Sequence, residues 1–181
     1  MKTIFKWSLL DWHRLVDSGI LADKAVELLA GEIIEMSPEG IDHSYTNHTV
    51  VEYLRELLNT TAVVRQALPV TLNNSEPQPD IAVVRLPATM YATHHPFAED
   101  IYWLIEISKT TLGKDLNEKQ SIYASNGIPE YWVIDLVEKK VWVFTQPEGD
   151  RYCNLVALTT GIINPTAFPN IVVNCDRLLV T

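Results

Sequence analysis

One short segment, residues 101–107 with the sequence IYWLIEI, constrains the fold more than any other part of the chain. It is apolar at both alternating sets of positions, which is typical of a central strand buried on both faces of a sheet. Glu106 interrupts the segment near its end. A carboxylate among apolar side chains is costly unless a cation or hydrogen-bond donor compensates for its lost hydration. We therefore predict a buried central strand that presents Glu106 to a dedicated partner.

The patterns around this strand predict one mixed α/β domain over residues 1–181. Helical periodicity marks three segments: residues 8–16, a stretch beginning at Asp42, and residues 115–125. Strand patterns bounded by turn residues mark residues 61–65, 70–72, 80–84, 131–136 and 141–145, with further short strands after residue 151. Ala30-Gly31 predicts a hairpin, and residues 85–100 predict a long loop. The order favours an α+β mixed sheet with an N-terminal helix and hairpin and extra C-terminal strands.

The glycines and cysteines exclude several common functions. The closest glycine pair, Gly31 and Gly40, is nine residues apart, so neither a dinucleotide fingerprint nor a P-loop is present and no nucleotide cofactor is expected. The two cysteines form no CxxC motif, which argues against a disulfide framework or a zinc site.

The sequence contains no recognisable membrane span or secretory signal, which favours a cytoplasmic protein. No apolar run approaches the roughly 18 to 20 residues of a membrane span. Lys6 and Asp11 interrupt the N-terminal segment, so it does not resemble a secretory signal. We therefore expect a cytoplasmic location and no membrane partner.

The charge balance limits how the chain could act on nucleic acid. Fourteen basic and twenty-three acidic residues give a net charge of -9. Proteins that coat nucleic acid are usually basic, because neutralising phosphates supplies most of the non-specific affinity. The negative net charge argues against a protein that coats nucleic acid. It leaves open an enzyme that holds a divalent metal.

Acidic and basic side chains near the central strand suggest a metal site. Asp80 begins a predicted strand after a proline, and Glu106 lies near the end of the central strand. The helix that follows places Asp115, Lys119 and Tyr123 four residues apart and hence on one face. Two carboxylates from adjacent strands suit Mg²⁺, and a nearby ammonium group could orient a water or stabilise phosphate charge.

These residues resemble a known family. The PD at Asp80, the EIS that begins at Glu106, the helical D-x3-K-x3-Y and the segment GIPEYWVID resemble the PD-(D/E)XK nuclease superfamily. Together with VELLAGEIIEMSP near the N-terminus, they are similar to the Uma-two family of restriction endonucleases. The resemblance covers most of the chain.

The resemblance implies a restriction-endonuclease-like αβββαβ core and Mg²⁺-dependent hydrolysis of DNA phosphodiester bonds, with Mn²⁺ as an alternative ion. Asp80 and Glu106 would be metal ligands, and the carbonyl of Ile107 would complete the set. It also implies a homodimer, because two sites are the simplest way to cut both strands of a duplex.

The chain departs from the superfamily pattern at one position. Ser108 stands where the motif lysine is usual, and Lys109 is one residue further along. Successive strand residues face opposite sides, so Lys109 should point away from Glu106. We predict that Lys119 supplies the catalytic ammonium from the helix instead, although it could merely pair with Asp115 on a solvated surface.

Other candidates have two interpretations. His43 could be a partly buried structural histidine or could contact the substrate or a metal ligand, and Tyr123 is expected to be mainly a packing residue. Glu27 and Glu32 flank the hairpin and could include a third metal ligand, but a solvated edge is the favoured interpretation. The adjacent His94-His95 is expected to belong to the loop.

Two rival functions remain open at this point. The net charge and the missing motif lysine favour a nucleic-acid-associated binding or assembly module without activity. The other rival is hydrolysis of a small phosphodiester or nucleotide, because a negative net charge is more compatible with a small substrate than with duplex DNA.

Overall fold

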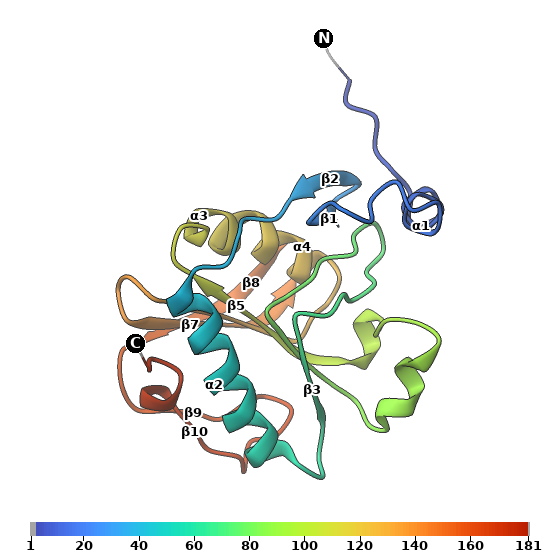
Figure 1. Cartoon of the computed structure of the whole chain (residues 1–181). Helices are drawn as coiled ribbons and strands as arrows, with labels where there is room; N and C mark the ends of the chain where they lie inside the picture. Colours follow the sequence, from blue (N-terminus) through green and yellow to red (C-terminus); the bar gives the residue numbers. More distant parts are fainter. Residues whose placement is uncertain (1–2, 181) are drawn as a thin grey trace.

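The computed structural model describes residues 3–180 and is built on a mixed sheet (Figure 1). The six strands follow the spatial order β3-β4-β5-β6-β7-β8. Their bounds are β3 (Val63–Gln66), β4 (Ile81–Val84), β5 (Ile101–Ser108), β6 (Glu130–Asp135), β7 (Lys140–Glu148) and β8 (Arg151–Leu158). Neighbouring strands are antiparallel except for the parallel pair β5 and β6. The central strand predicted from IYWLIEI is therefore present as β5.

Helices cover both faces of this sheet (Figure 1). The long helix α2 (Ile41–Leu58) packs on one face. The other face carries a continuous helical segment made of α3 (Leu112–Lys114), a π-helical turn η3 (Asp115–Lys119) and α4 (Gln120–Ser125). In chain order, α2, β3, β4, β5, this helical segment and β6 form the predicted αβββαβ core.

The remaining elements extend this core at both ends of the chain. Those before it are the helix α1 (Leu9–Asp17) and a hairpin of β1 (Val26–Leu29) and β2 (Glu32–Glu35). Two 3₁₀ turns, η1 (Ala88–Ala92) and η2 (Ala98–Asp100), are inserted between β4 and β5. The antiparallel pair of β9 (Ile162–Ile163) and β10 (Val173–Asn174) and the 3₁₀ turn η4 (Cys175–Arg177) follow β8. No helix among residues 3–180 has the length and apolar character needed to cross a membrane.

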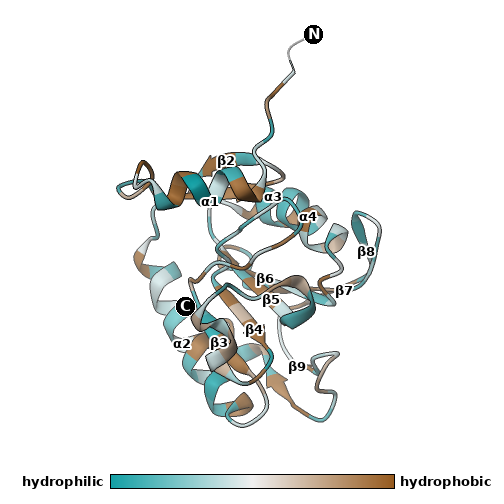
Figure 2. Cartoon of the chain, turned by 90° about the vertical axis from the view of Figure 1, so that its right-hand side faces the viewer, coloured by the Kyte–Doolittle hydropathy of each residue, from teal (hydrophilic) through white to brown (hydrophobic). Residues whose placement is uncertain are grey.

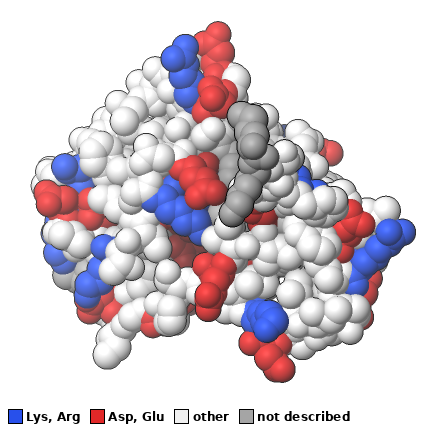
Figure 3. Space-filling view, turned by 90° about the horizontal axis from the view of Figure 1, so that it is seen from above, with Lys and Arg blue, Asp and Glu red and all other residues white. Residues whose placement is uncertain are grey.

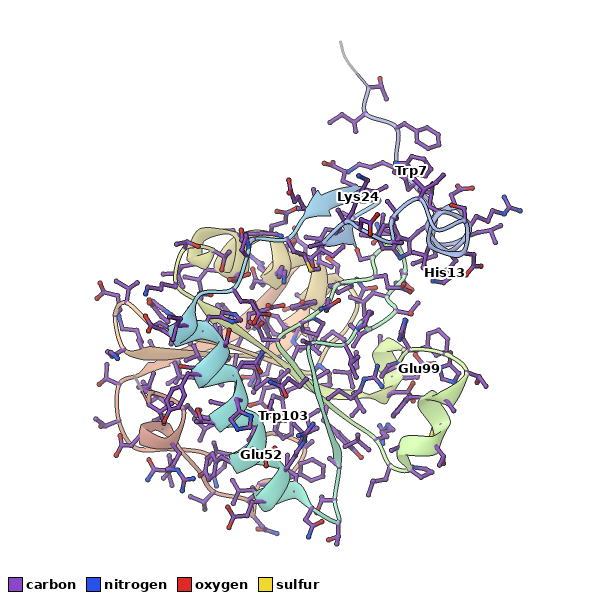
Figure 4. The ribbon with its side chains drawn as sticks, viewed as in Figure 1. Trp7, His13, Lys24, Glu52, Glu99 and Trp103 are labelled. Atoms are coloured by element: carbon purple, nitrogen blue, oxygen red, sulfur yellow. The ribbon has the colours of Figure 1, made fainter. Side chains whose placement is uncertain are left out.

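Strand β5 divides the core because its side chains alternate between the two faces. Trp103 and Ile105 pack with α2, and Leu104 packs with Tyr123 and Tyr131 on the opposite face. Figure 4 labels Trp103 beside α2, and Figure 2 shows the apolar colouring of β4 in the interior. Glu106 lies two residues after Leu104, so the strand period places it on the face covered by the α3–α4 segment.

Local sequence signals explain the N-terminal elements. The hydroxyl of Ser8 accepts a hydrogen bond from the backbone N–H of Asp11, as an N-cap does, and confirms the predicted start of α1. Ala30 and Gly31 both have positive φ, 46° and 77°, which suits a two-residue hairpin turn between β1 and β2. A side chain at Gly31 would also approach Cβ of Lys6 to 3.0 Å.

Two sequence expectations differ from the structure. Residues 70–72 are not a strand: the N–H groups of Val70 and Leu72 donate to Pro77 and Ser75 within a turn, and Thr71 forms an isolated bridge. The helix predicted from Asp115 begins earlier, at Leu112, because N–H groups of the first turn already bond to the carbonyl of Thr111.

Candidate active site

The sheet register brings together the two carboxylates that are predicted as metal ligands. Ile81 of β4 pairs with Ile105 of β5, so the antiparallel ladder sets Asp80 opposite Glu106. Residues opposite each other in such a pair point to the same face. Both side chains line a cavity of about 570 Å³, which the β1–β2 hairpin and the loop after β5 also border.

Glu106 is a buried residue of this cavity and accepts two hydrogen bonds at one oxygen. Lys119 Nζ lies 2.8 Å from Glu106 Oε1, and the hydroxyl of Tyr123 donates to the same atom at 2.7 Å. Only 5% of the Glu106 side chain and 7% of the Lys119 side chain are exposed. Lys119 therefore contacts Glu106 inside the cavity and does not form the solvated pair with Asp115. Tyr123 packs in the core, as expected, and also donates a hydrogen bond to Glu106.

The residues at and after the end of β5 have other partners. The hydroxyl of Ser108 donates to Asp115 Oδ2 at 2.6 Å, and the hydroxyl of Thr111 donates to the same oxygen at 2.7 Å. Lys109 lies beyond the end of β5 and forms an exposed ion pair with Asp42 at the start of α2. Lys109 therefore borders the cavity, while the buried ammonium beside Glu106 belongs to Lys119.

Asp80 is held between the sheet and α2. The backbone N–H of Ile107 donates to Asp80 Oδ2 at 2.6 Å. His43 Nε2 lies 3.1 Å from Asp80 Oδ1, and His43 Nδ1 lies 3.6 Å from Glu39 Oε2. Ligand atoms of Glu39, His43 and Asp80 all lie within 4.8 Å of one another, a spacing that could hold a metal ion. The helical stripe of α2 thus brings His43 into contact with a predicted ligand.

Glu27 is the acidic residue that the sequence interpretation placed wrongly. It is not on a solvated edge: it is 2% exposed, with Lys114 Nζ at 2.9 Å from Oε1 and Lys119 Nζ at 3.6 Å from Oε2. Its Oε2 also accepts from the backbone N–H of Gln78 at 3.2 Å. Glu32, by contrast, pairs with Lys6 on the outside of the hairpin.

A signal for Glu27 was present in the sequence. Glu27 stands within VELL, so like Glu106 it is a carboxylate inside an apolar strand. Its partner Lys114 is 87 residues away in the chain, so its contact depends on how the hairpin packs.

The acidic groups outnumber the lysines inside the cavity. Glu27, Asp80, Glu106 and Asp115 line it together with Lys114 and Lys119. Burial and the negative charges of the other three carboxylates, opposed by Lys119, raise the pKa of Glu106 to about 8. Burial alone would lower the pKa of Lys119, but the surrounding carboxylates raise it, so this side chain stays protonated.

At Glu27 and His43, neighbouring charges also outweigh the effect of burial on the pKa. Burial would raise the pKa of Glu27, but Lys119 and Lys114 lower it, so this carboxylate stays ionised. Burial would lower the pKa of His43, but the hydrogen bond and charge of Asp80 raise it. The excess of carboxylates is what a divalent cation would neutralise.

The adjacent histidines lie elsewhere. His94 stacks on Phe97 with ring centroids 4.9 Å apart, and its Nδ1 lies 2.8 Å from the carbonyl oxygen of His95. Neither histidine lines the cavity that contains Asp80 and Glu106. Their predicted place in a loop is confirmed.

The αβββαβ core and the paired strand-end acids fit the restriction-endonuclease-like class that the sequence resemblance implies. The family model Uma2, described as "Putative restriction endonuclease", matches residues 11–176, and the chain belongs to this family. No curated protein matches the chain.

A solved structure has the same fold. The chain is similar to the crystal structure of a "putative nuclease belonging to DUF820" from Anabaena variabilis ATCC 29413, with 19% sequence identity and a TM-score of 0.68. The match covers 87% of this chain and 91% of the other. This likeness supports the assignment of the fold.

The raised pKa of Glu106 predicts how stability depends on pH. Between its ordinary value of 4.5 and about 8, the folded state binds a proton that the unfolded state releases. The free energy of unfolding of the metal-free protein should therefore fall as pH rises from about 5 to 8, by at most about 1.4 kcal/mol per pH unit. His43, whose pKa is also raised, contributes with the same sign above its ordinary value of 6.5.

Urea unfolding in EDTA across this range measures the slope. Glu106→Gln cannot take up the proton, so most of the pH dependence should disappear in this variant. A variant with the full wild-type slope would show that Glu106 does not titrate in this window.

Proposed function

We propose that the chain is a Mg²⁺-dependent endonuclease that hydrolyses phosphodiester bonds of DNA, with Mn²⁺ as an alternative ion. The observation that carries this proposal is the meeting of Asp80, Glu106 and Lys119 in one cavity of a nuclease-family fold. Two carboxylates can hold the ion that metal-assisted phosphodiester hydrolysis uses, and a nearby ammonium can stabilise the charge on the phosphate.

The residues present fit a hard divalent cation. Asp80 and Glu106 supply carboxylate oxygens, and the carbonyl of Ile107 at the end of β5 is the third proposed ligand. Oxygen ligands of this kind are those that Mg²⁺ prefers, and His43 next to Asp80 would also suit Mn²⁺. A bound ion would polarise the phosphate and lower the pKa of an attacking water.

The other side chains act on these groups. Tyr123 fixes the orientation of Glu106, while the N–H of Ile107 and His43 fix that of Asp80. Lys119 would stabilise negative charge on the scissile phosphate from a position set by Glu106.

Two residues beside these have supporting roles. Ser108 holds Asp115 on the first helical turns, and Lys109 at the edge of the cavity would contact a neighbouring phosphate.

The assembly and location are part of the same proposal. The proposal includes a homodimer acting in the cytoplasm, because the superfamily resemblance implies a dimer and two sites are the simplest way to cut both strands of a duplex. Size-exclusion chromatography with light scattering measures the number of chains.

Metal binding and cleavage together test the function. Mg²⁺ or Mn²⁺ should raise the melting temperature, because an ion that binds only the folded state stabilises it by about 2.7 kcal/mol at 100 times its Kd. Labelled DNA incubated with either ion should be cut, and EDTA should stop the reaction. Stabilisation without cleavage of any nucleic acid would favour the binding-module alternative, and the absence of both would contradict the proposal.

A further inference from the structure

The carboxylate of Glu106 has two partners in the proposed site. It lies 2.8 Å from the ammonium group of Lys119, and it is a proposed ligand of the divalent cation. A carboxylate whose charge a cation neutralises attracts a neighbouring ammonium group less strongly. The Lys119 side chain is only 7% exposed, and a buried ammonium group that loses its counterion is strongly destabilising. Lys119 therefore needs a second carboxylate when Glu106 binds an ion.

Glu27 is placed to be this second carboxylate. Among the residues that the structure describes, Lys119 forms an ion pair with one carboxylate besides that of Glu106, and this is Glu27, with Oε2 3.6 Å from Nζ. Asp115 also lines the cavity, but its side chain accepts hydrogen bonds from Ser108 and Thr111 instead. Glu27 is 2% exposed, so solvent screens its attraction for the ammonium group only weakly.

The burial of this contact distinguishes it from the charges on the surface. In Figure 3, seen from above, basic and acidic side chains are scattered over the exposed face. Lys6 and Glu32 form one exposed pair on the outside of the same hairpin, with side chains 51% and 39% exposed. Such pairs contribute little, because water and salt screen them. Glu32 is therefore a matched control for Glu27.

The contacts of Glu27 favour a counterion over a third metal ligand. Lys114 Nζ lies 2.9 Å from Oε1, and the backbone N–H of Gln78 donates to Oε2 at 3.2 Å. Both oxygens of the carboxylate thus already have donors. Within the described part of the chain, the group of potential metal ligands that contains Asp80 does not include Glu27.

We infer that Glu27 is a positioning residue, the counterion that keeps the ammonium group of Lys119 in place when Glu106 binds the divalent cation. The β1–β2 hairpin then contributes to the active site although it belongs to a separate two-stranded sheet. The inference rests on the proposed nuclease function and assigns a part in it to a residue outside the αβββαβ core.

Calorimetric titration with Mg²⁺ tests this role without a substrate. In Glu27→Gln the ion must compete with Lys119 for Glu106, so Mg²⁺ should bind roughly tenfold more weakly, a difference of about 1.4 kcal/mol. Glutamine keeps the shape of glutamate and can still accept from Lys114, so the hairpin should stay in place. Adding Lys119→Ala to Glu27→Gln should restore most of the lost affinity, although Lys119→Ala alone changes it little.

Two single variants separate the charge of Glu27 from its shape and from the hairpin. Glu27→Asp keeps the negative charge and should bind Mg²⁺ more tightly than Glu27→Gln. Glu32→Gln removes a carboxylate from the same hairpin and should bind Mg²⁺ like the wild type. Circular dichroism verifies that each variant is folded.

Single-turnover cleavage with saturating Mg²⁺ measures the effect on the chemical step. Glu27→Gln should lower the rate by about 10- to 100-fold, because a misplaced catalytic group loses much of its effect. The same substitution made in Lys119→Ala should have little further effect, since no ammonium group remains to be positioned. A purely structural role for Glu27 would lower the rate equally in both backgrounds.

The outcomes separate the inference from the function on which it rests. The inference is overturned if the double variant binds Mg²⁺ as weakly as Glu27→Gln, if the two substitutions act additively on the affinity, or if Glu27→Asp binds no better than Glu27→Gln. Each of these results leaves the nuclease proposal standing. Wild-type protein that neither binds Mg²⁺ nor cuts nucleic acid would contradict the proposed function itself.

Discussion

Glu106→Gln should abolish both the Mg²⁺-dependent rise in melting temperature and all cleavage while leaving the fold intact. Burial and the neighbouring carboxylates raise the pKa of Glu106 to about 8, so in the metal-free protein this side chain takes up a proton at a higher pH than an ordinary glutamate does. Glutamine has the same shape and charge as that protonated form, and its oxygen can still accept from Lys119 and Tyr123. A divalent ion requires the ionised carboxylate, which glutamine cannot supply.

The same reasoning predicts that metal binding releases a proton. Because binding must ionise Glu106, the affinity for Mg²⁺ should increase from pH 6 to pH 8. Calorimetric titrations in two buffers of different ionisation enthalpy measure the number of protons released. Glu106→Gln should release none.

Two further variants complete this experiment. Asp80→Asn should lose the metal response as well. Glu130→Gln is the matched control, because Glu130 is a buried glutamate on the neighbouring strand β6, where it accepts from the indole of Trp132 and the N–H of Thr166. It should lose some stability and keep the metal response. A normal metal response in both Asp80→Asn and Glu106→Gln would show that neither residue is a ligand.

The central part of the fold followed from local patterns. The apolar run of β5, the stripe of α2 and the turn at Ala30-Gly31 each contain their own structural information, since period and turn chemistry depend on neighbouring residues. The strand predicted at residues 70–72 was wrong because it also relied on local pattern alone. Their β-branched and apolar residues suit a strand, but the carbonyls of Ser75 and Pro77 satisfy their N–H groups in a turn.

The site could be predicted only where its residues lie on the core elements. Asp80 and Glu106 stand at the ends of strands that pair, so their meeting follows from the register. Glu27 and Lys114 could not be predicted in the same way, because the hairpin forms its own sheet and its position over the cavity depends on packing between distant segments. The number of acids in the site was therefore underestimated.

The helix that carries Lys119 shows a second limit of pattern reasoning. Residues 115–119 form a π-helical turn, which is wider than an α-helical turn and often occurs at functional sites. The four-residue spacing correctly grouped Lys119 with Tyr123, since both reach Glu106. The same spacing also grouped Asp115 with them, and Asp115 does line the cavity, but its side chain is held by Ser108 and Thr111 and does not contact Glu106.

Lys119→Ala should reduce the rate of cleavage by about 10²- to 10³-fold, which corresponds to about 2.7–4 kcal/mol of transition-state stabilisation. The ammonium group is held by Glu106 at 2.8 Å and by Glu27 at 3.6 Å, so it is already oriented before substrate arrives. Metal affinity should change little, because the lysine is not a ligand and Glu106 remains. Lys119→Arg should restore little activity, since a planar guanidinium does not fit the position of a compact ammonium.

Lys109→Ala separates this role from a general effect of positive charge. Lys109 stands nearer the superfamily position of the catalytic lysine, but it pairs with Asp42 in a solvated ion pair, which water and salt screen. Its removal should raise KM for a nucleic-acid substrate and leave kcat close to that of the wild type. Single-turnover cleavage with saturating Mg²⁺ measures the chemical step for each variant, and circular dichroism verifies that each is folded. If Lys109→Ala stops cleavage and Lys119→Ala does not, the catalytic ammonium belongs to the loop after β5, and the buried Lys119 serves to neutralise Glu106 and Glu27.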